Sequence, residues 1–397
     1  MNNPLLVIGS GPAGLAAAIA FGKGAMVLER NAMCGKKLLL SGTGQCNFTN
    51  DLAIPEFLEQ CEPFARFLKP ALYHWDNQAF ISLLAEQGCP AKVREDGKVF
   101  PASFKSMDVR DTLLRIAEAH GATFLYNCVV TAVEHGSDGF SVQTNQGVLQ
   151  SKQLVIAGGG KSYPQTGSDG SAYLLAESLG HQIVPLHPAL AAIDVASYGF
   201  YKSCAGISLP QLRIKADKQL FTGDMLFTHK GLSGPVIINN SHHLRDGQEL
   251  HLCLAIDPDK KILALISASP DRKLIKVLKA LNLPEALLIA VLSTCQISPD
   301  TRAAELRAAD RKRLSAYLDS ALFIISHVES FATAMLTAGG VERSEVNPKT
   351  MESRLIPGLY FAGEVLDYNL PTGGFNIQMA FSTGHLAGAK AKKELLQ

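Results

Sequence analysis

The sequence lacks three features that would place it in other functional classes. It has no excess charge, because 37 Lys and Arg residues face 36 Asp and Glu residues, so neither nucleic acid nor an anionic membrane is a favoured partner. No two of its eight cysteines form a C-x-x-C pair, which argues against a zinc ribbon or a thioredoxin-type redox pair. The longest apolar run, near residues 286–292, is too short to span a bilayer. We therefore predict no metal site, no membrane span, no nucleic-acid partner, and a small-molecule substrate.

The beginning of the chain also lacks the pattern of a secretory signal. An apolar strand begins at Leu5 with no basic segment before it. Unpaired cysteines in a chain without a signal indicate a reducing compartment, and we expect a cytoplasmic protein. With 397 residues, of which 47% are hydrophobic, the chain is long enough for two or three domains with sizeable cores.

What the chain does have is an apolar strand that leads into a glycine turn and a helix. Residues 5–14 read LLVIGSGPAG, and a second short strand ends in Glu29. This is the G-x-G-x-x-G dinucleotide fingerprint in its strand–turn–helix context. Gly9 allows the tight turn, Gly11 allows a pyrophosphate to approach the backbone, and Gly14 allows the helix to pack on the strand.

The fingerprint also predicts which parts of a nucleotide it meets. A pyrophosphate would lie at the positive end of the helix, against Gly11, Pro12, Ala13 and Gly14, of which Pro12 has no N–H to donate. Glu29 lies about 20 residues past the first glycine, where a carboxylate accepts the ribose hydroxyls and disfavours a 2′-phosphate. The sequence therefore predicts FAD or NAD rather than NADP.

Hydrophobic patterns predict further elements along the first half of the chain. We expect helices around residues 55–69, 76–87, 107–120 and 168–179. Strands are expected at residues 123–128, 129–134, 140–144, 148–150 and 154–157. The last of these strands ends in three consecutive glycines, Gly158 to Gly160, which predict a second close approach of the backbone.

The second half of the chain predicts an insertion. Short strands broken by Gly and Pro precede a helical stretch at residues 258–320, and strand character returns at residues 322–326. A parallel sheet begun at Leu5 and completed near Phe361 must carry residues 190–340 as an insert with its own β and α parts. We expect a nucleotide domain of residues 1–189 and 337–397, a β part of the insert at residues 190–257 and 321–336, and a helical domain of residues 258–320.

Four sequence blocks give a family resemblance. They are the fingerprint at residues 9–29, GKKLLLSGTGQCN at 35–47, LFTHKGLSGP at 226–235, and TAGG at 337–340 through NPKTMES at 347–353 to LYFAGE at 359–364. In these blocks the chain resembles bacterial NAD(P)/FAD-dependent oxidoreductases of the aminoacetone oxidase type. The resemblance implies an α/β fold, a glutathione-reductase-type FAD-binding Rossmann-like domain interrupted by a β-barrel and an α-helical insert. It also implies FAD as the cofactor.

Together with the resemblance, the residues predict where the rest of the FAD would lie. Lys36 and Lys37 can supply positive charge to the phosphates, and Arg30 is a further predicted cofactor residue. The resemblance implies that the adenine edge lies at Val130 and that the ribityl hydroxyls lie at Glu364, beside Gly363. The flavin ring or ribityl chain would lie along Ser41, Gly42, Gly44 and Asn47. The second glycine approach adds Ala157 and Gly158, and the start of the last helix adds Gly374, Asn376 and Ile377. The N-terminus of that last helix should point at the N1–C2=O edge of the flavin. It would favour the negative charge of the reduced ring by roughly 0.3–1 kcal/mol.

No acid or base stands out from the residues. A flavin transfers the hydride itself, but reduction of a carbon–carbon double bond also needs a proton donor, for which Tyr163, Cys46, His229 and Tyr368 are candidates. We expect an FAD-dependent oxidoreductase that passes a hydride from transiently bound NADH or NADPH to a small, largely apolar acceptor, such as a C=C bond. Two alternatives stay open: an FAD-dependent amine oxidase that uses oxygen, and a non-catalytic flavin-binding redox or RNA-associated protein.

Overall fold

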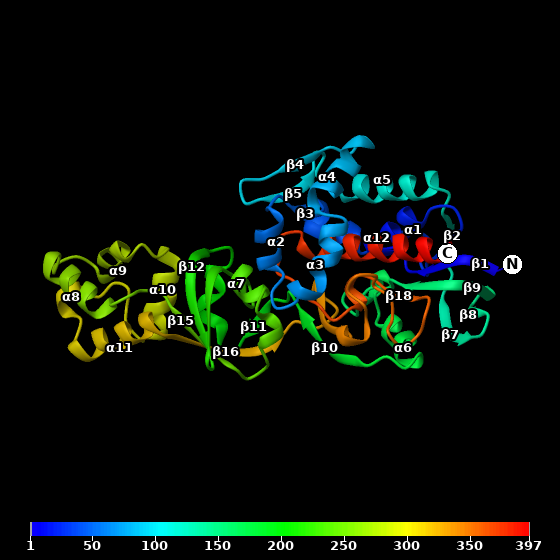
Figure 1. Cartoon of the computed structure of the whole chain (residues 1–397). Helices are drawn as coiled ribbons and strands as arrows, with labels where there is room; N and C mark the ends of the chain where they lie inside the picture. Colours follow the sequence, from blue (N-terminus) through cyan, green and yellow to red (C-terminus); the bar gives the residue numbers. More distant parts are fainter. Residues whose placement is uncertain (1, 397) are drawn as a thin grey trace. The chain divides into compact units, whose positions relative to one another are not determined.

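The computed structural model of the chain describes residues 2–396, which form two compact units (Figure 1). One unit comprises residues 1–188 and 331–397, and the other comprises residues 189–330. The chain therefore leaves the first unit midway and returns to it before the C-terminus. Among the described residues, no helix has both the length and the apolar character needed to cross a membrane.

A seven-stranded sheet forms the centre of the first unit. Its order is β6 (Thr123–Leu125), β2 (Ala25–Leu28), β1 (Asn2–Ile8), β9 (Gly147–Ile156), β8 (Gly139–Thr144) and β7 (Val130–Gly136), and β18 (Leu359–Phe361) also pairs with β9. Strands β6, β2, β1, β9 and β18 are parallel, whereas β7, β8 and the first part of β9 are antiparallel. Ile156 pairs with both Ile8 and Phe361, so the expected sheet from the first strand to the last is confirmed.

Strand β9 differs from the prediction of two separate strands at residues 148–150 and 154–157, which was wrong. It pairs with β1 from Gln150 to Ile156, and on its other edge with β8 as far as Ser151 and with β18 from Leu154 onward. The residues between the parts paired with β8 and β18 include no Gly or Pro, and the Ser151 hydroxyl donates to the Gln153 carbonyl at 2.9 Å. The strand therefore continues while one of its edges exchanges partners.

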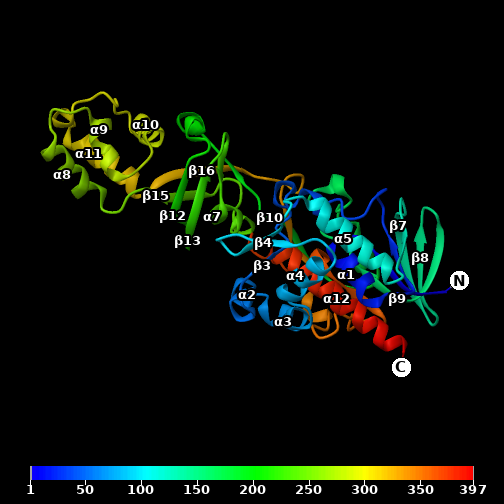
Figure 2. The same cartoon turned by 90° about the horizontal axis from the view of Figure 1, so that it is seen from above.

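Three helices of the first unit pack against one another, as both views show (Figures 1 and 2). Helix α1 (Pro12–Phe21) contacts α5 (Ser106–Ala119) and α12 (Phe375–Leu395). A Cβ on Gly384 would lie 2.1 Å from the Ala13 carbonyl oxygen, and one on Gly388 would lie 2.2 Å from that of Ala17. The backbones of α1 and α12 therefore approach as closely as they do only because both positions are glycine.

The remaining elements of the first unit are short. They are α2 (Ile54–Gln60), α3 (Ala65–His74), α4 (Asn77–Glu86), α6 (Ser171–Ser178), the sheet β3 (Thr49–Asn50), β5 (Lys98–Pro101) and β4 (Ala91–Val93), and the pair β10 (Ile183–Ala189) and β17 (Leu336–Val341). The single helix expected at residues 55–69 is thus two helices. Pro63, which has no N–H for the helical ladder, lies between them.

The second unit contains a closed six-stranded barrel, as expected for the insert. Its order is β11 (Ile193–Val195), β14 (Gly231–Ser233), β13 (Gln219–Phe227), β12 (Ser208–Ala216), β15 (Glu249–Cys253) and β16 (Ala321–Val328). On β12 the buried Leu212 and Ile214 alternate with the exposed Arg213 and Lys215, which is the pattern of a barrel wall. Helices α7 (Pro235–Ile238), α8 (Pro258–Ala268), α9 (Leu274–Leu278), α10 (Glu285–Thr294) and α11 (Ala308–Asp319) share a hydrophobic core with the barrel. The finer domain limits stay a prediction.

A histidine pair between α3 and α12 predicts acid sensitivity. His74 Nε2 lies 3.1 Å from His385 Nδ1, and the Trp75 ring centroid lies 3.9 Å from that of His385. Burial first, and then the charges of His74 and His120, lower the pKa of His385 to about 3. Burial and the Lys390 ammonium also lower the pKa of His74.

Because the folded pKa of His385 lies below its unfolded value, the unfolded state binds the proton first as the pH falls below about 6.5. The contribution of His385 to the free energy of unfolding is therefore fully present at neutral pH and is lost progressively towards pH 3. We expect the site to cost about 2 kcal/mol of unfolding free energy between pH 7.5 and pH 5, measured by urea unfolding. His385→Gln should remove that part of the loss, whereas the exposed His229→Gln should not; equal pH profiles for all three proteins would contradict the assignment.

Candidate functional site

The glycine turn after β1 has the backbone geometry of a ligand site. Gly9 has a φ of 97°, and a Cβ on it would lie 2.6 Å from the Ala157 carbonyl oxygen. A Cβ on Gly14 would lie 1.9 Å from the Gly9 carbonyl oxygen, so the protein's own packing requires both glycines. A Cβ on Gly11 would meet no atom within 4 Å. Only at Gly11 does the missing side chain leave room for something other than the protein.

Helix α1 points its N-terminus at this space. Gly11 is the N-cap residue, no side chain caps the first turn, and that turn holds no acidic residue. The first amides of a helix have no partner within the helix, so those of Ala13 and Gly14 remain available to a ligand. With the helix dipole, they form a site for an anion.

Glu29 ends β2 beside the turn and is 6% exposed. Its Oε2 accepts from the Ser10 N–H at 3.1 Å and from the Ser10 hydroxyl, and its Oε1 accepts from the Asn31 N–H at 2.8 Å and the Asn31 amide at 2.7 Å. A carboxylate has about four acceptor positions, and here the protein fills all four. A ribose hydroxyl at Glu29 would therefore have to replace the Ser10 hydroxyl or the Asn31 side chain.

Two further residues predicted to bind the cofactor, both cations, contact the loop that follows β9. Arg30 donates to the Gly167 carbonyl at 3.1 Å and pairs with Asp169 at 2.5 Å. Lys36 Nζ donates to the Gln165 carbonyl at 3.0 Å. These cations join the segment after β2 to the segment after β9, which places both segments at the same end of the sheet.

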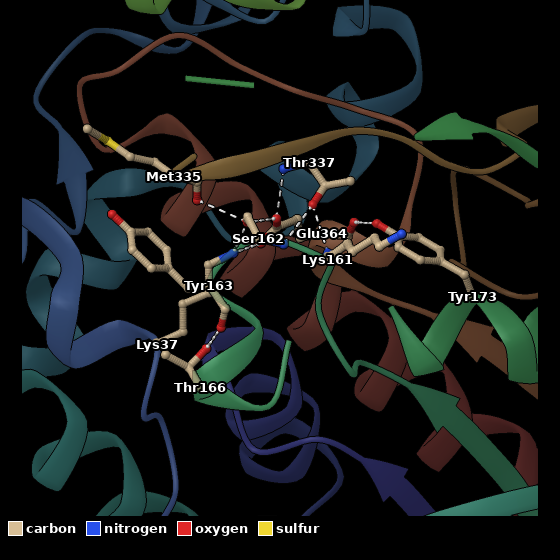
Figure 3. A network of polar contacts seen from close by, with 9 residues as sticks. All are labelled: Lys37, Lys161, Ser162, Tyr163, Thr166, Tyr173, Met335, Thr337 and Glu364. Carbon is tan, nitrogen blue, oxygen red and sulfur yellow. Dashed lines mark hydrogen bonds and ion pairs between the residues drawn. The ribbon is translucent and has the colours of Figure 1, made fainter. Parts of the chain in front are cut away.

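Glu364 is the centre of a polar network drawn from four distant parts of the chain (Figure 3). Its Oε2 accepts from Lys37 Nζ at 2.7 Å, and its Oε1 accepts from the Thr337 N–H at 2.9 Å and the Ser162 hydroxyl at 3.0 Å. Lys37 Nζ also donates to the Ser162 hydroxyl at 2.6 Å. A Cβ on Gly160 would lie 2.5 Å from Glu364 Oε1, so the third glycine after β9 leaves the room that this carboxylate occupies.

The segment predicted along the flavin has an irregular backbone. Gly42, Thr43, Gly44 and Cys46 all have positive φ, between 54° and 85°, which is uncommon for Thr and Cys. Asn47 Oδ1 is buried and has no hydrogen-bond partner. Since buried polar atoms are nearly always paired, this oxygen indicates a missing ligand donor.

The last helix begins next to that segment. A Cβ on Gly374 would lie 2.3 Å from the Thr49 carbonyl oxygen, and the Asn50 amide donates to the Gly373 carbonyl at 3.2 Å. No side chain caps α12 and its first turn holds no acidic residue. The Asn376 side chain bonds both the N–H and the carbonyl of Leu370, at 3.0 and 2.8 Å, so it shapes the preceding loop. Its neighbour Ile377 is half-buried.

The remaining predicted cofactor residues lie close to those above. A Cβ on Gly363 would lie 2.7 Å from Ala13 Cβ, so the turn after β18 touches the fingerprint helix. The backbone of Ala157 and Gly158 faces Gly9. Val130 begins β7, two residues after Cys128, whose N–H donates to the Glu29 carbonyl at 2.9 Å. The carboxyl ends of β1, β2, β9 and β18 therefore gather the predicted nucleotide residues.

The four proton-donor candidates differ in how far they are exposed. Cys46 is fully buried, and burial raises the pKa of its thiol to about 12. Tyr368 is 1% exposed, and burial raises its pKa well above the ordinary value. Tyr163 is half-buried with a left-handed backbone, and His229 is exposed in the second unit. Only Tyr163 and His229 are accessible enough to meet a substrate.

Four residues of the site were missed in the sequence: Ser10, Asn31, Ser162 and Thr337. Ser162 follows the three noted glycines by two positions, and Thr337 opens the block of residues 337–340. Both signals were present in the sequence, but only the folded chain brings them to Glu364.

An open surface hollow of about 610 Å³ lies apart from these residues. It is bordered by the end of α4 and the first part of α5, including Glu86, Asp108 and Arg115, and none of the predicted cofactor residues lines it. The predicted cofactor residues therefore do not coincide with this hollow. Across residues 2–396, no cluster of three His, Cys, Asp or Glu side chains could hold a metal.

The residues at the turn fit FAD. The open space at Gly11, the two helix N-termini without caps and the unpaired Asn47 oxygen are features that the pyrophosphate, the flavin edge and a polar group of FAD would satisfy. The fit rests on these features of the protein.

Comparison with known proteins agrees with the geometry. The family model described as the HI0933-like protein Rossmann domain matches residues 3–390. A ribosomal RNA dihydrouridine synthase from Haemophilus influenzae is 32% identical, covering 98% of each chain. A 3-dehydro-bile acid delta(4,6)-reductase from Clostridium scindens is 29% identical, covering 98% of this chain and 99% of its own. A mutant of the Escherichia coli quinol fumarate reductase FrdA matches in fold, with a TM-score of 0.55 and 15% identity, covering 100% of this chain and 71% of that chain.

Proposed function

The chain belongs to the HI0933-like family of Rossmann-domain proteins and is an FAD-dependent oxidoreductase; from this premise we propose that it reduces a C=C bond conjugated to a carbonyl group, with NADH or NADPH as electron donor. The proposal depends on one observation. Two relatives that match almost the whole chain have names that refer to products or reactions in which a C=C bond conjugated to a carbonyl group is reduced. Formation of dihydrouridine saturates the uracil C=C next to a carbonyl. A delta(4,6)-reductase of a 3-dehydro bile acid acts on C=C bonds conjugated to the 3-oxo group.

Such a reduction adds a hydride to the carbon remote from the carbonyl and a proton to the carbon beside it. FAD, when bound, supplies the two-electron chemistry. The amides of Ala13 and Gly14 would hold the pyrophosphate, and Glu29 would accept the adenosine ribose in place of the Ser10 hydroxyl or the Asn31 side chain. The amides at the start of α12 would stabilise negative charge on the ring they face, by roughly 0.3–1 kcal/mol.

The proton donor would be Tyr163 or His229, because Cys46 and Tyr368 are buried. Tyr163 directly follows Ser162, whose hydroxyl contacts both Lys37 and Glu364. Its N–H donates to the Phe331 carbonyl at 2.8 Å, which fixes this part of the loop. We propose Tyr163 as the first donor to test.

Two classes of acceptor fit the proposal. A small apolar enone agrees with the near-neutral charge of the chain. Ribosomal RNA is the second class, because the 32% identical relative carries that substrate in its name. The prediction of no nucleic-acid partner is therefore left open, and we propose to test both acceptors with the same protein.

Anaerobic mixing of the purified flavoprotein with NADH or NADPH is expected to bleach the visible flavin band. Addition of a cyclic enone, or of uridine-containing ribosomal RNA, should then restore the band and yield the saturated product. Stopped-flow absorbance and mass spectrometry of the product measure both steps. Bleaching by an amine but by neither nicotinamide would replace this proposal with the amine oxidase alternative.

A further inference from the structure

The carboxylate of Glu364 has one acceptor position left. Its Oε1 accepts two hydrogen bonds, from the Thr337 N–H and the Ser162 hydroxyl, and its Oε2 accepts one, from Lys37 Nζ (Figure 3). Each carboxylate oxygen can accept about two. Oε2 therefore retains an open lone pair, in contrast to Glu29, whose four positions are all filled by the protein.

The Lys37 ammonium is committed to this carboxylate. Its Nζ donates to Glu364 Oε2 at 2.7 Å and to the Ser162 hydroxyl at 2.6 Å, and the Lys37 and Glu364 side chains are 25% and 15% exposed. Because an ammonium has three N–H donors, these two contacts leave at most one for a phosphate. The neighbouring Lys36 is different, since its ammonium contacts only a backbone carbonyl at 3.0 Å and lies nearer the solvent.

The rest of the network holds the carboxylate in one orientation. The Thr337 hydroxyl accepts from the Lys161 and Ser162 N–H groups at 2.8 and 3.2 Å, which ties β17 to the loop after β9. The Tyr173 hydroxyl donates to the Glu364 backbone carbonyl at 3.1 Å. Thr337 and Ser162 hold Oε1 and Lys37 holds Oε2, so these partners together fix the orientation of the carboxylate.

We propose that Lys37 is a positioning residue for the flavin half of FAD: it holds Glu364 so that the open lone pair of Oε2 accepts a hydroxyl of the ribityl chain. This inference rests on FAD being the cofactor. It reassigns Lys37 from the phosphates, where the sequence placed it, to the opposite half of the cofactor. The phosphates are left to the amides of α1.

Adenosine diphosphate tests this assignment, because it carries the adenosine and pyrophosphate of FAD but no ribityl chain. Protein stripped of flavin would be titrated with FAD and with ADP by calorimetry. We expect Lys37→Met to weaken FAD binding at least tenfold and to change ADP binding less than twofold. Lys37→Arg, which keeps the charge and a donor, should recover most of the FAD affinity.

Lys36→Met is the matched control, and it should leave the ratio of the FAD and ADP affinities unchanged. Ser162→Ala removes one donor to Glu364 and should weaken FAD selectively, so it tests the network even where Lys37→Met fails to fold. Equal weakening of ADP and FAD by Lys37→Met would overturn the inference and return Lys37 to the phosphates. Failure of the wild-type protein to bind FAD at all would instead refute the cofactor itself.

Discussion

Gly11→Val is expected to give a folded protein that no longer binds FAD. Gly11 has φ −71° and ψ −176°, which valine adopts without strain, and a Cβ there meets no protein atom within 4 Å. The side chain would instead fill the space in front of the amides of Ala13 and Gly14. Loss of two hydrogen bonds to a charged group costs at least about 3 kcal/mol, so the affinity for FAD should fall on the order of 100-fold or more.

The measurement pairs flavin content with thermal unfolding of the flavin-free protein. Gly11→Val should purify colourless and unfold at the wild-type temperature. Gly14→Ala is the matched contrast, because its Cβ would lie 1.9 Å from the Gly9 carbonyl oxygen and should destabilise the protein itself. Normal FAD binding by Gly11→Val would show that the pyrophosphate does not lie at this turn.

The contrast between these two glycines explains why the fingerprint could be predicted from the sequence. A tight turn, a close backbone approach and a helix start are local requirements, and only certain residues satisfy them at that spacing. The same reasoning anticipated the parallel sheet that the chain leaves and rejoins, because a buried strand ending in a glycine turn is a local signal at residues 359–363 as well.

The contacts of Glu364 could not be predicted in the same way. Its partners Lys37, Ser162 and Thr337 lie 327, 202 and 27 positions away along the chain. Which lysine reaches a carboxylate across such separations depends on how strands and loops are ordered in space. The sequence offered Lys36 and Lys37 as equals, and only the fold separates the lysine paired with Glu364 from the one that contacts a loop carbonyl.

Local reasoning was also wrong where neighbouring strands decided the outcome. The two strands expected at residues 148–150 and 154–157 are joined because β9 stays paired with β1 while its other edge changes partner from β8 to β18. Periodicity describes which face of a segment is buried, but it does not say which strand lies beside it.

Gly388→Val is expected to destabilise the whole nucleotide unit. A Cβ at this position would lie 2.2 Å from the Ala17 carbonyl oxygen, which belongs to the backbone of α1 and cannot rotate away. The two helices would have to separate, and overpacking of this kind costs 1–3 kcal/mol or more. Because the clash is with backbone and valine adds two further methyl groups, we expect a loss of roughly 3 kcal/mol or more in the free energy of unfolding.

Urea unfolding of the flavin-free protein measures this loss without interference from the cofactor. Gly136→Val is the matched control, since a Cβ on Gly136 in β7 meets no atom within 4 Å and its stability should stay near that of the wild type. A small effect at Gly388 would mean that α12 can move away from α1 at little cost. The contact between the two helices would then not fix the positions of their N-termini. Other contacts would have to keep the FAD site rigid.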